Sequence, residues 1–233
     1  MAPIGGGTFT VQNKILPGAY INFVSLGSAA RLGTRGVVAL PLELNWGPEN
    51  QVFSVTAEDF NKTAFGYEPT AAPILLVKEA LKRAKTLLAY RVNSGGVKAS
   101  NTIGGMTVTA KWSGTRGNDI KVAILTNVDD ATKVDVVTYL GAIEVDSQTV
   151  SASTGSANLK NNNFVTFGTA ATLTPASATA LTGGTNGTVD GTSYSAFLNA
   201  IEVETFNVIG YPGTDETIKA LFGAFVKRLR YDN

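Results

Sequence analysis

The run from Gly36 to Leu44 limits the possible folds of this chain more than any other stretch. Apart from Glu43 it contains no polar side chain, and it begins with two β-branched valines. A strand with one solvated face alternates apolar and polar residues, whereas a strand covered on both faces is apolar throughout. The run therefore predicts a central strand of an α/β sheet. Proline cannot donate to a sheet ladder, so Pro41 predicts that the strand ends or bulges near residues 40–42.

The residues after this strand predict alternating extended and helical segments. A turn over 45–50 leads to a short strand, and Thr56 to Asp59 predicts a helix start, because Thr56 can cap free amides and acids favour the first turn. A helix is predicted over 73–85, with Ile74, Val77, Leu81 and Ala84 on one face. Its basic opposite face is either a solvated surface or a contact with an acidic neighbour. A strand over 86–92 completes the unit.

The chain changes character between Val97 and about Gly187. Short β-prone runs separated by turns occupy 106–112, 120–125, 133–140, 142–146 and 164–167. Alternation in the first and third of these runs predicts one buried and one solvated face. The segment 113–119 lacks the Gly-Lys-Ser/Thr of a phosphate loop, so it predicts a tight loop between paired strands. The stretch 174–191 is interpreted as a return linker. The region predicts a small antiparallel β sandwich or barrel inserted into the α/β unit.

The last segment returns to helices and strands. A helix over 192–201 capped by Thr192 or Ser193, a short buried strand over 206–210 and an amphipathic helix over 215–230 are predicted. A helix in this position normally leads to a further parallel strand, so the sequence is expected to be an amino-terminal portion. The predicted division is 1–20 for an arm and first turn, 21–96 and 188–233 for the two parts of a mixed α/β core, and 97–187 for the inserted β domain.

Composition removes most catalytic chemistries. The 233 residues include no Cys and no His, which excludes disulfides, thiolate chemistry, the Ser-His-Asp triad and the commonest metal ligands. We therefore predict no enzyme activity, no catalytic or metal-binding residues and no cofactor. A net charge of +1, from 19 basic and 18 acidic residues, gives no sign of a nucleic-acid partner.

The sequence contains neither an apolar run long enough to cross a membrane nor a signal peptide at its start. We therefore predict no membrane insertion, and synthesis in the cytoplasm without secretion by a signal peptide.

The first residues form a separate feature. Gly5, Gly6 and Gly7 precede the β-prone run Thr8-Phe9-Thr10-Val11, and polar residues follow it. A short strand tethered by three glycines is poorly placed to join its own core. It is either a frayed terminus or an arm that adds a strand to the exposed sheet edge of another chain.

Several motifs occur in an order that resembles the sheath proteins of contractile phage tails and R-type bacteriocins. They are Leu16-Pro-Gly-Ala-Tyr-Ile21, the apolar strand ending before Gly47-Pro48, Thr56-Ala-Glu-Asp-Phe60, Phe65-Gly66 and Leu88-Ala-Tyr-Arg-Val-Asn-Ser-Gly-Gly96. The resemblance covers residues 15–96 best. Gly114-Thr-Arg-Gly-Asn118 is similar to a segment in the inserted β domain of sheath proteins from Gram-positive phages.

This resemblance implies a structural subunit of a contractile sheath in a virion tail or bacteriocin particle. Its partners would be copies of itself in helically stacked hexameric rings, the tail tube protein, and baseplate and tail terminator proteins. Sheath subunits are linked by extended terminal arms, so the resemblance favours Thr8–Val11 as a donated strand and Gly5–Gly7 as its hinge.

Two other functions remain open from the residues alone. The inserted β domain could bind a carbohydrate or cell surface through an aromatic patch formed by Trp112, Tyr139, Phe164 and Phe167, although alternating aromatic residues in strands more often belong to a core. A hydrolase could use carboxylate pairs such as Glu144 with Asp146, or Asp129 with Asp130, but nothing in the sequence selects one pair.

Overall fold

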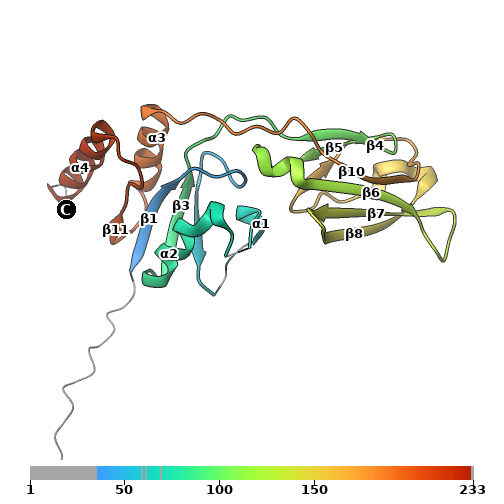
Figure 1. The fold of residues 1–233 in the computed structure, drawn as a ribbon, viewed down its shortest axis with the longest axis horizontal. Helices are drawn as coiled ribbons and strands as arrows, with labels where there is room; N and C mark the ends of the chain where they lie inside the picture. The colour runs from blue at the N-terminus through green and yellow to red at the C-terminus, as the bar shows by residue number, and fades with distance from the viewer. Residues whose placement is uncertain (1–35, 59, 61, 69, 232–233) are drawn as a thin grey trace, which may run out of the picture. The chain divides into compact units, whose positions relative to one another are not determined.

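A computed structural model describes residues 36–231 except 59, 61 and 69 (Figure 1). Thr8–Val11 and Gly5–Gly7 lie outside these residues. In chain order the elements are β1 (Val37–Leu42), β2 (Val52–Thr56), α1 (Lys62–Phe65), η1 (Ala72–Ile74), α2 (Leu75–Arg83), β3 (Thr86–Arg91), β4 (Ser100–Ile103), β5 (Met106–Ala110), η2 (Thr115–Asp119), β6 (Ile120–Thr126), β7 (Lys133–Leu140), β8 (Ile143–Ser151), η3 (Ala152–Asn158), β9 (Val165–Phe167), β10 (Ala176–Ala180), α3 (Gly191–Ile201), β11 (Val208–Ile209) and α4 (Glu216–Tyr231).

One sheet has the order β11-β1-β3-β2 and forms, with its helices, what we call the α/β unit. β11, β1 and β3 are parallel, and β2 is antiparallel to β3. The two faces of β1 enter different cores: Leu40 packs in one apolar cluster with α2, and Ala39 packs in another with α3 and α4. Helices therefore cover both faces of the central strand, as its apolar run predicts.

Pro41 lies inside β1 without removing a ladder hydrogen bond. The carbonyls of Val37 and Ala39 accept from the amides of Asn207 and Gly210 at 2.9 and 3.0 Å, so odd-numbered residues of β1 face β11. Pro41 has this orientation, but β11 pairs with β1 only at Val38 and Ala39. The position that lacks an N–H therefore faces the side where β11 has already ended. β1 ends at Leu42, within the predicted range.

The helix predicted over 73–85 is confirmed as η1 and α2. Its stripe of Ile74, Val77, Leu81 and Ala84 is buried. The helix start predicted at Thr56 is wrong: Thr56 is the last residue of β2 and pairs with Thr86, and α1 begins only at Lys62. Strand pairing continues through Thr56 because a β-branched residue is suited to a strand at least as well as to the capping position of a helix.

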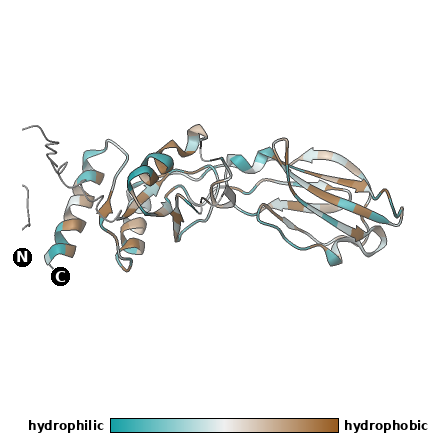
Figure 2. Cartoon of the chain, turned by 90° about the horizontal axis from the view of Figure 1, so that it is seen from below, coloured by the Kyte–Doolittle hydropathy of each residue, from teal (hydrophilic) through white to brown (hydrophobic). Residues whose placement is uncertain are grey.

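The inserted region consists of two sheets, with the orders β10-β6-β7-β8 and β4-β5-β9. Their inner faces share one apolar core, which includes Met106, Val108, Ile124 and Val136. Hydrophobic and polar residues alternate along several of these strands (Figure 2). Neither sheet closes on itself, so the region is a sandwich rather than a barrel, and we call it the β sandwich.

Two details of the predicted sandwich are wrong. The segment 113–119 does not join paired strands, because it links β5 of one sheet to β6 of the other through η2. The stretch 174–191 is not linker throughout, since β10 pairs with β6 as an edge strand. β10 could not be recognised in the sequence, because its small side chains, such as those of Ala176, Ser177 and Thr179, show no strong alternation of apolar and polar character.

The last elements mostly follow their predicted order. Asp190, rather than Thr192 or Ser193, caps α3: its carboxylate accepts from the Ser193 amide at 3.0 Å, and the Ser193 hydroxyl contacts the Asp190 amide in return. β11 is an edge strand whose Val208 is half exposed, so the prediction that this strand is buried is wrong. Asp215 caps α4 by accepting from the Thr217 and Ile218 amides. In the described part of the chain, no helix has the length and apolar character needed to cross a membrane.

Candidate functional site

The residues predicted to form an intersubunit arm and its hinge, Thr8–Val11 and Gly5–Gly7, remain predictions because they lie outside the described residues. One member of each carboxylate pair considered for a hydrolase has a structural role, Asp130 in one pair and Asp146 in the other. Asp130 accepts from the hydroxyl and amide of Thr132 and pairs with Lys133, and these contacts lower the pKa of Asp130 to about 2. Asp146 accepts from the amides of Gln148 and Asn162. Among the described residues no group of acidic side chains could hold a metal ion.

The aromatic patch considered for carbohydrate binding is largely core. Phe164 is buried, and Trp112 and Phe167 pack half-buried against the same sandwich core. A sugar-stacking platform needs an exposed ring face, which Phe164 does not offer. The interpretation that such alternating aromatic residues belong to a core is therefore confirmed for Phe164, and the alternative of a ligand-binding patch loses this residue.

The described residues concentrate unusual contacts where the α/β unit meets the β sandwich, a region we call the junction. Trp46 belongs by sequence to the connection between β1 and β2, yet its side chain is 0% exposed within the sandwich core. Its ring stacks on Phe164, with centroids 6.2 Å apart. Gly66 has a φ of +70°, and a Cβ there would lie 3.0 Å from the indole, so glycine allows this close approach.

Arg91, the last residue of β3, is fully buried in the junction. Its Nη1 donates to the carbonyls of Gly47 at 3.3 Å and Ser113 at 2.9 Å, and it lies 3.5 Å from the Glu49 carboxylate. Ser113 belongs to the sandwich and Gly47 to the α/β unit. One guanidinium therefore connects the two, and burial lowers its pKa while Glu49 partly offsets that effect.

Glu49 completes this connection from the other side. Its carboxylate accepts from the backbone amides of Ser113 at 3.2 Å and Gly95 at 3.3 Å. Burial opposes ionisation, but hydrogen bonds from Ser113 and Gly95 and the charge of Arg91 outweigh it, so the pKa of Glu49 lies below its usual value. The charged form of Glu49 is therefore the form that the junction stabilises.

The loop 113–119 contributes a third connection through Arg116. Its Nε donates to the Gly66 carbonyl at 2.8 Å, its guanidinium lies 4.4 Å from the centre of the Tyr67 ring, and its backbone amide donates to the Asn45 carbonyl at 3.3 Å. From the sequence alone, this loop has no predicted role beyond joining strands. Its position on the α/β unit depends on contacts between segments far apart in the chain.

The two connections between the α/β unit and the sandwich run antiparallel to each other. Val97 and Thr185 exchange backbone hydrogen bonds of 3.1 and 3.0 Å. A Cβ on Gly187 would lie 1.9 Å from the Ser94 carbonyl oxygen, which no side chain could accept without movement of the backbone. The close packing of these connections requires glycine at this position.

Replacing Gly187 with alanine is expected to lower the free energy of unfolding by about 1–3 kcal/mol, because the added methyl group forces the two connections apart. Gly223→Ala is the matched control: Gly223 lies inside α4 with nothing within 4 Å of an added Cβ, so alanine should stabilise the chain by up to about 1 kcal/mol. Urea unfolding followed by circular dichroism measures both. Equal stability of Gly187→Ala and the unmodified chain would contradict the packing at the connections.

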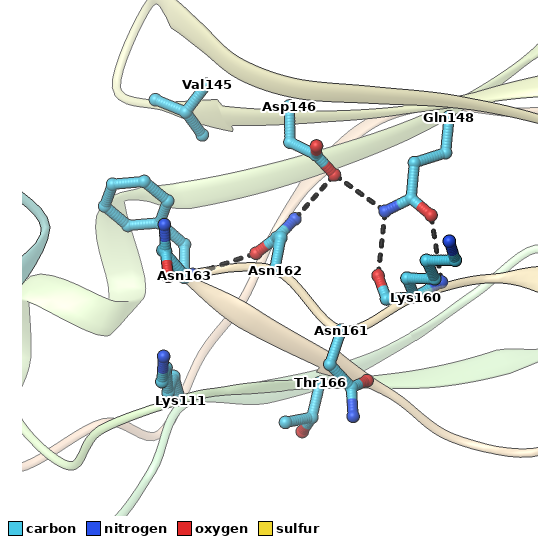
Figure 3. A pocket seen from close by; sticks show the side chains of 10 residues that line it. Lys111, Val145, Asp146, Gln148, Lys160, Asn161, Asn162, Asn163 and Thr166 are labelled. Carbon is cyan, nitrogen blue, oxygen red and sulfur yellow. Dashed lines mark hydrogen bonds between the residues drawn. The ribbon is translucent and has the colours of Figure 1, made fainter.

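A separate hollow of about 750 Å³ lies on the sandwich between β8 and residues 160–166, and we call it the polar pocket (Figure 3). The Gln148 side chain brackets the backbone of Lys160, donating to its carbonyl at 2.8 Å and accepting from its amide at 2.9 Å. Asp146 Oδ2 accepts from Gln148 at 2.8 Å and Asn162 at 2.9 Å. These hydrogen bonds fix one wall of the pocket.

Comparison with known proteins gives the family. The model of the "Tail sheath protein Gp18 domain III N-terminal region" matches residues 35–92, and that of the "Phage tail sheath protein beta-sandwich domain" matches residues 94–186. The two models together cover the β1–β3 part of the α/β unit and nearly all of the sandwich. The chain belongs to the phage tail sheath family, as the resemblance predicts.

Individual relatives agree with this assignment. A sheath tail protein from Desulfitobacterium hafniense is 45% identical, with a TM-score of 0.80 over 92% of this chain and 50% of its own. One from Listeria innocua is 39% identical, with a TM-score of 0.77 over 85% of this chain and 45% of its own. From Bacillus subtilis (strain 168), the uncharacterised protein YqbK is 40% identical and the phage-like element PBSX protein XkdK is 38% identical, each over 97% of this chain and 53% of the relative. The chain thus spans about half the length of these relatives.

Proposed function

We propose that this chain acts as part of a structural subunit of a contractile tail sheath. The subunits assemble as helically stacked hexameric rings around an inner tail tube, in a virion tail or an R-type bacteriocin particle, and contract to drive the tube through a cell envelope. The observation that carries this proposal is that two sheath-domain models match consecutive parts of the chain, residues 35–92 and 94–186. The role is mechanical, with no catalytic residue or cofactor.

The junction suits such a role. A sheath that changes its packing needs subunits that move as rigid bodies, because switching between discrete packings stores free energy only if the parts themselves do not deform. Trp46, Arg91, Glu49 and Arg116 all connect the α/β unit to the sandwich. We propose that these contacts make residues 36–96 of the α/β unit one rigid body with the sandwich, and that residues 1–20 form the arm that links one subunit to the next.

The arm requires an acceptor edge in the neighbouring subunit. In the described part of the chain, β2 and β11 are the outer strands of the α/β sheet, and each pairs on one side only. Such an edge offers free backbone groups to an added strand. We propose that Thr8–Val11 of one copy adds to one of these edges in another, with Gly5–Gly7 as the hinge. Tail tube, baseplate and tail terminator proteins are the other expected partners.

Deletion of residues 1–15 is expected to abolish ordered assembly, because it removes the donated strand. The 233-residue chain, concentrated and imaged by electron microscopy, should form tubes or sheets, and the deleted chain should form none. The control is thermal unfolding, which should stay nearly unchanged because the arm contributes nothing to its own core. Unimpaired assembly of the deleted chain would argue against the arm, and a full chain that stays discrete at every concentration would argue against self-assembly by this region.

A second candidate function is recognition of a carbohydrate or cell surface by the β sandwich. The polar pocket favours it, because it is a large hollow lined by amide, carboxylate and ammonium groups. The aromatic residues considered for this candidate do not support it, because Phe164 is buried.

A further inference from the structure

Two lysines and one carboxylate, that of Asp146, line the polar pocket. Lys111 and Lys160 both line it, and in the part of the chain that the structure describes neither ammonium forms an ion pair. The Lys111 ammonium lies 5.7 Å from the centre of the Trp112 ring. In Figure 3 the two lysines lie apart, with Asn161 and Thr166 between them. The pocket therefore presents positive charge from more than one direction.

Both lysines project from backbone that is held in place. Lys111 follows β5, and its amide donates to the Phe164 carbonyl at 2.8 Å, which extends the β5–β9 pairing. Lys160 is bracketed by Gln148 through the two hydrogen bonds described above. A ligand that reached both lysines would therefore order only their side chains, which reduces the entropic cost of binding.

Positive charge favours an anionic ligand, and the remaining polar groups of the pocket indicate what else such a ligand carries. The side-chain oxygen of Asn161 accepts from the Phe167 backbone amide at 2.9 Å, which leaves the side-chain NH2 group of Asn161 as a donor. Asp146 uses Oδ2 for its two amide donors, which leaves Oδ1 to accept a hydroxyl. Donors therefore outnumber acceptors in the pocket, and a matching ligand carries many acceptor oxygens and some hydroxyl groups.

We propose that the polar pocket binds an anionic carbohydrate, a sugar or polyol chain whose phosphate or carboxylate contacts Lys111 and Lys160 and whose hydroxyl donates to Asp146. Phe164 is only 5% exposed, so the pocket has no aromatic platform on which a neutral sugar could stack. Charge, rather than ring stacking, selects the ligand. This site refines the second candidate function and does not depend on the sheath role.

Titration calorimetry of the chain at low ionic strength tests the proposal with four probes: an oligomer of glycerol phosphate, an oligogalacturonate, the neutral sugar maltohexaose and an oligothymidylate. One or both of the anionic carbohydrates should bind, and their comparison tells phosphate from carboxylate. The Lys111→Gln/Lys160→Gln variant should weaken binding at least about tenfold, because it removes two charge-assisted hydrogen bonds. Raising the salt concentration should weaken binding further.

The matched control is Lys98→Gln/Lys121→Gln, which removes two exposed lysines of the sandwich that do not line the pocket. It should bind like the unmodified chain. The proposal fails if both double variants lose the same affinity, if maltohexaose binds as tightly as the anionic oligomers, if oligothymidylate competes equally, or if neither anionic carbohydrate binds at millimolar concentration. Because these measurements need no assembly, their failure leaves the sheath proposal untouched.

Discussion

Replacing Arg91 with methionine is expected to lower the free energy of unfolding by about 3–5 kcal/mol, the usual cost of removing one partner of a buried ion pair. The variant leaves the Glu49 carboxylate, whose side chain is only 20% exposed, without its cation. It also removes the donors to the Gly47 and Ser113 carbonyls. Chemical unfolding followed by circular dichroism measures the loss.

Arg83→Met is the matched control, because Arg83 is exposed in the last turn of α2 and its replacement should change stability by no more than about 0.5 kcal/mol. Adding Glu49→Gln to Arg91→Met should recover part of the loss, since no unpaired charge then remains, and the double-mutant cycle gives the coupling between the two. If Arg91→Met were as stable as Arg83→Met, Arg91 would not hold the junction.

The net contribution of Arg91 to the free energy of unfolding is smaller than the loss expected when Arg91 is replaced. Its Nη2 is buried and has no hydrogen-bond partner among the described atoms, and burying such a donor carries a desolvation cost. A buried ion pair of this kind often adds little net stability compared with apolar residues of the same volume. We infer that Arg91 is more important for fixing the position of the sandwich than for total stability.

The sequence predicted best the elements whose pattern is local. β7 was predicted at both of its ends, because Val134, Val136 and Leu140 alternate with residues of the opposite face. The stripe of α2 was also correct. β4 and β10 were missed because edge strands of small polar residues carry little hydrophobic signal.

The junction and the polar pocket could not be predicted in the same way. Trp46 stands in a run of Asn, Gly and Pro that is typical of turns, and only its packing on Phe164 shows that it is core. One signal was present: Arg91 directly follows the apolar run Leu87–Tyr90 near the end of the predicted strand 86–92, and an arginine there needs a buried partner. The identity of that partner depends on tertiary structure, because Glu49 and Ser113 come from distant segments.

Replacing Trp46 with alanine is expected to cost about 3–5 kcal/mol, because it leaves a cavity of indole size in the sandwich core. Trp112→Ala is the control: that side chain is only half-buried, so its loss should be clearly smaller. The chain has two tryptophans, so a Trp112→Phe background leaves Trp46 as the sole indole. Its emission should be blue-shifted in the folded chain and move to longer wavelength on unfolding.

The Trp46→Ala variant also tests whether the junction couples the α/β unit to the β sandwich. Trp46 is attached to the α/β unit by sequence and to the sandwich by packing, so its loss should speed amide hydrogen exchange in β9, beside Phe164, before it affects α3. Equal losses of protection in β9 and α3 would mean that the chain unfolds as one cooperative unit, with Trp46 as an ordinary core residue. If Trp46→Ala cost no more than Trp112→Ala, the indole would not lie in the sandwich core, and the α/β unit would hold the sandwich through polar contacts alone.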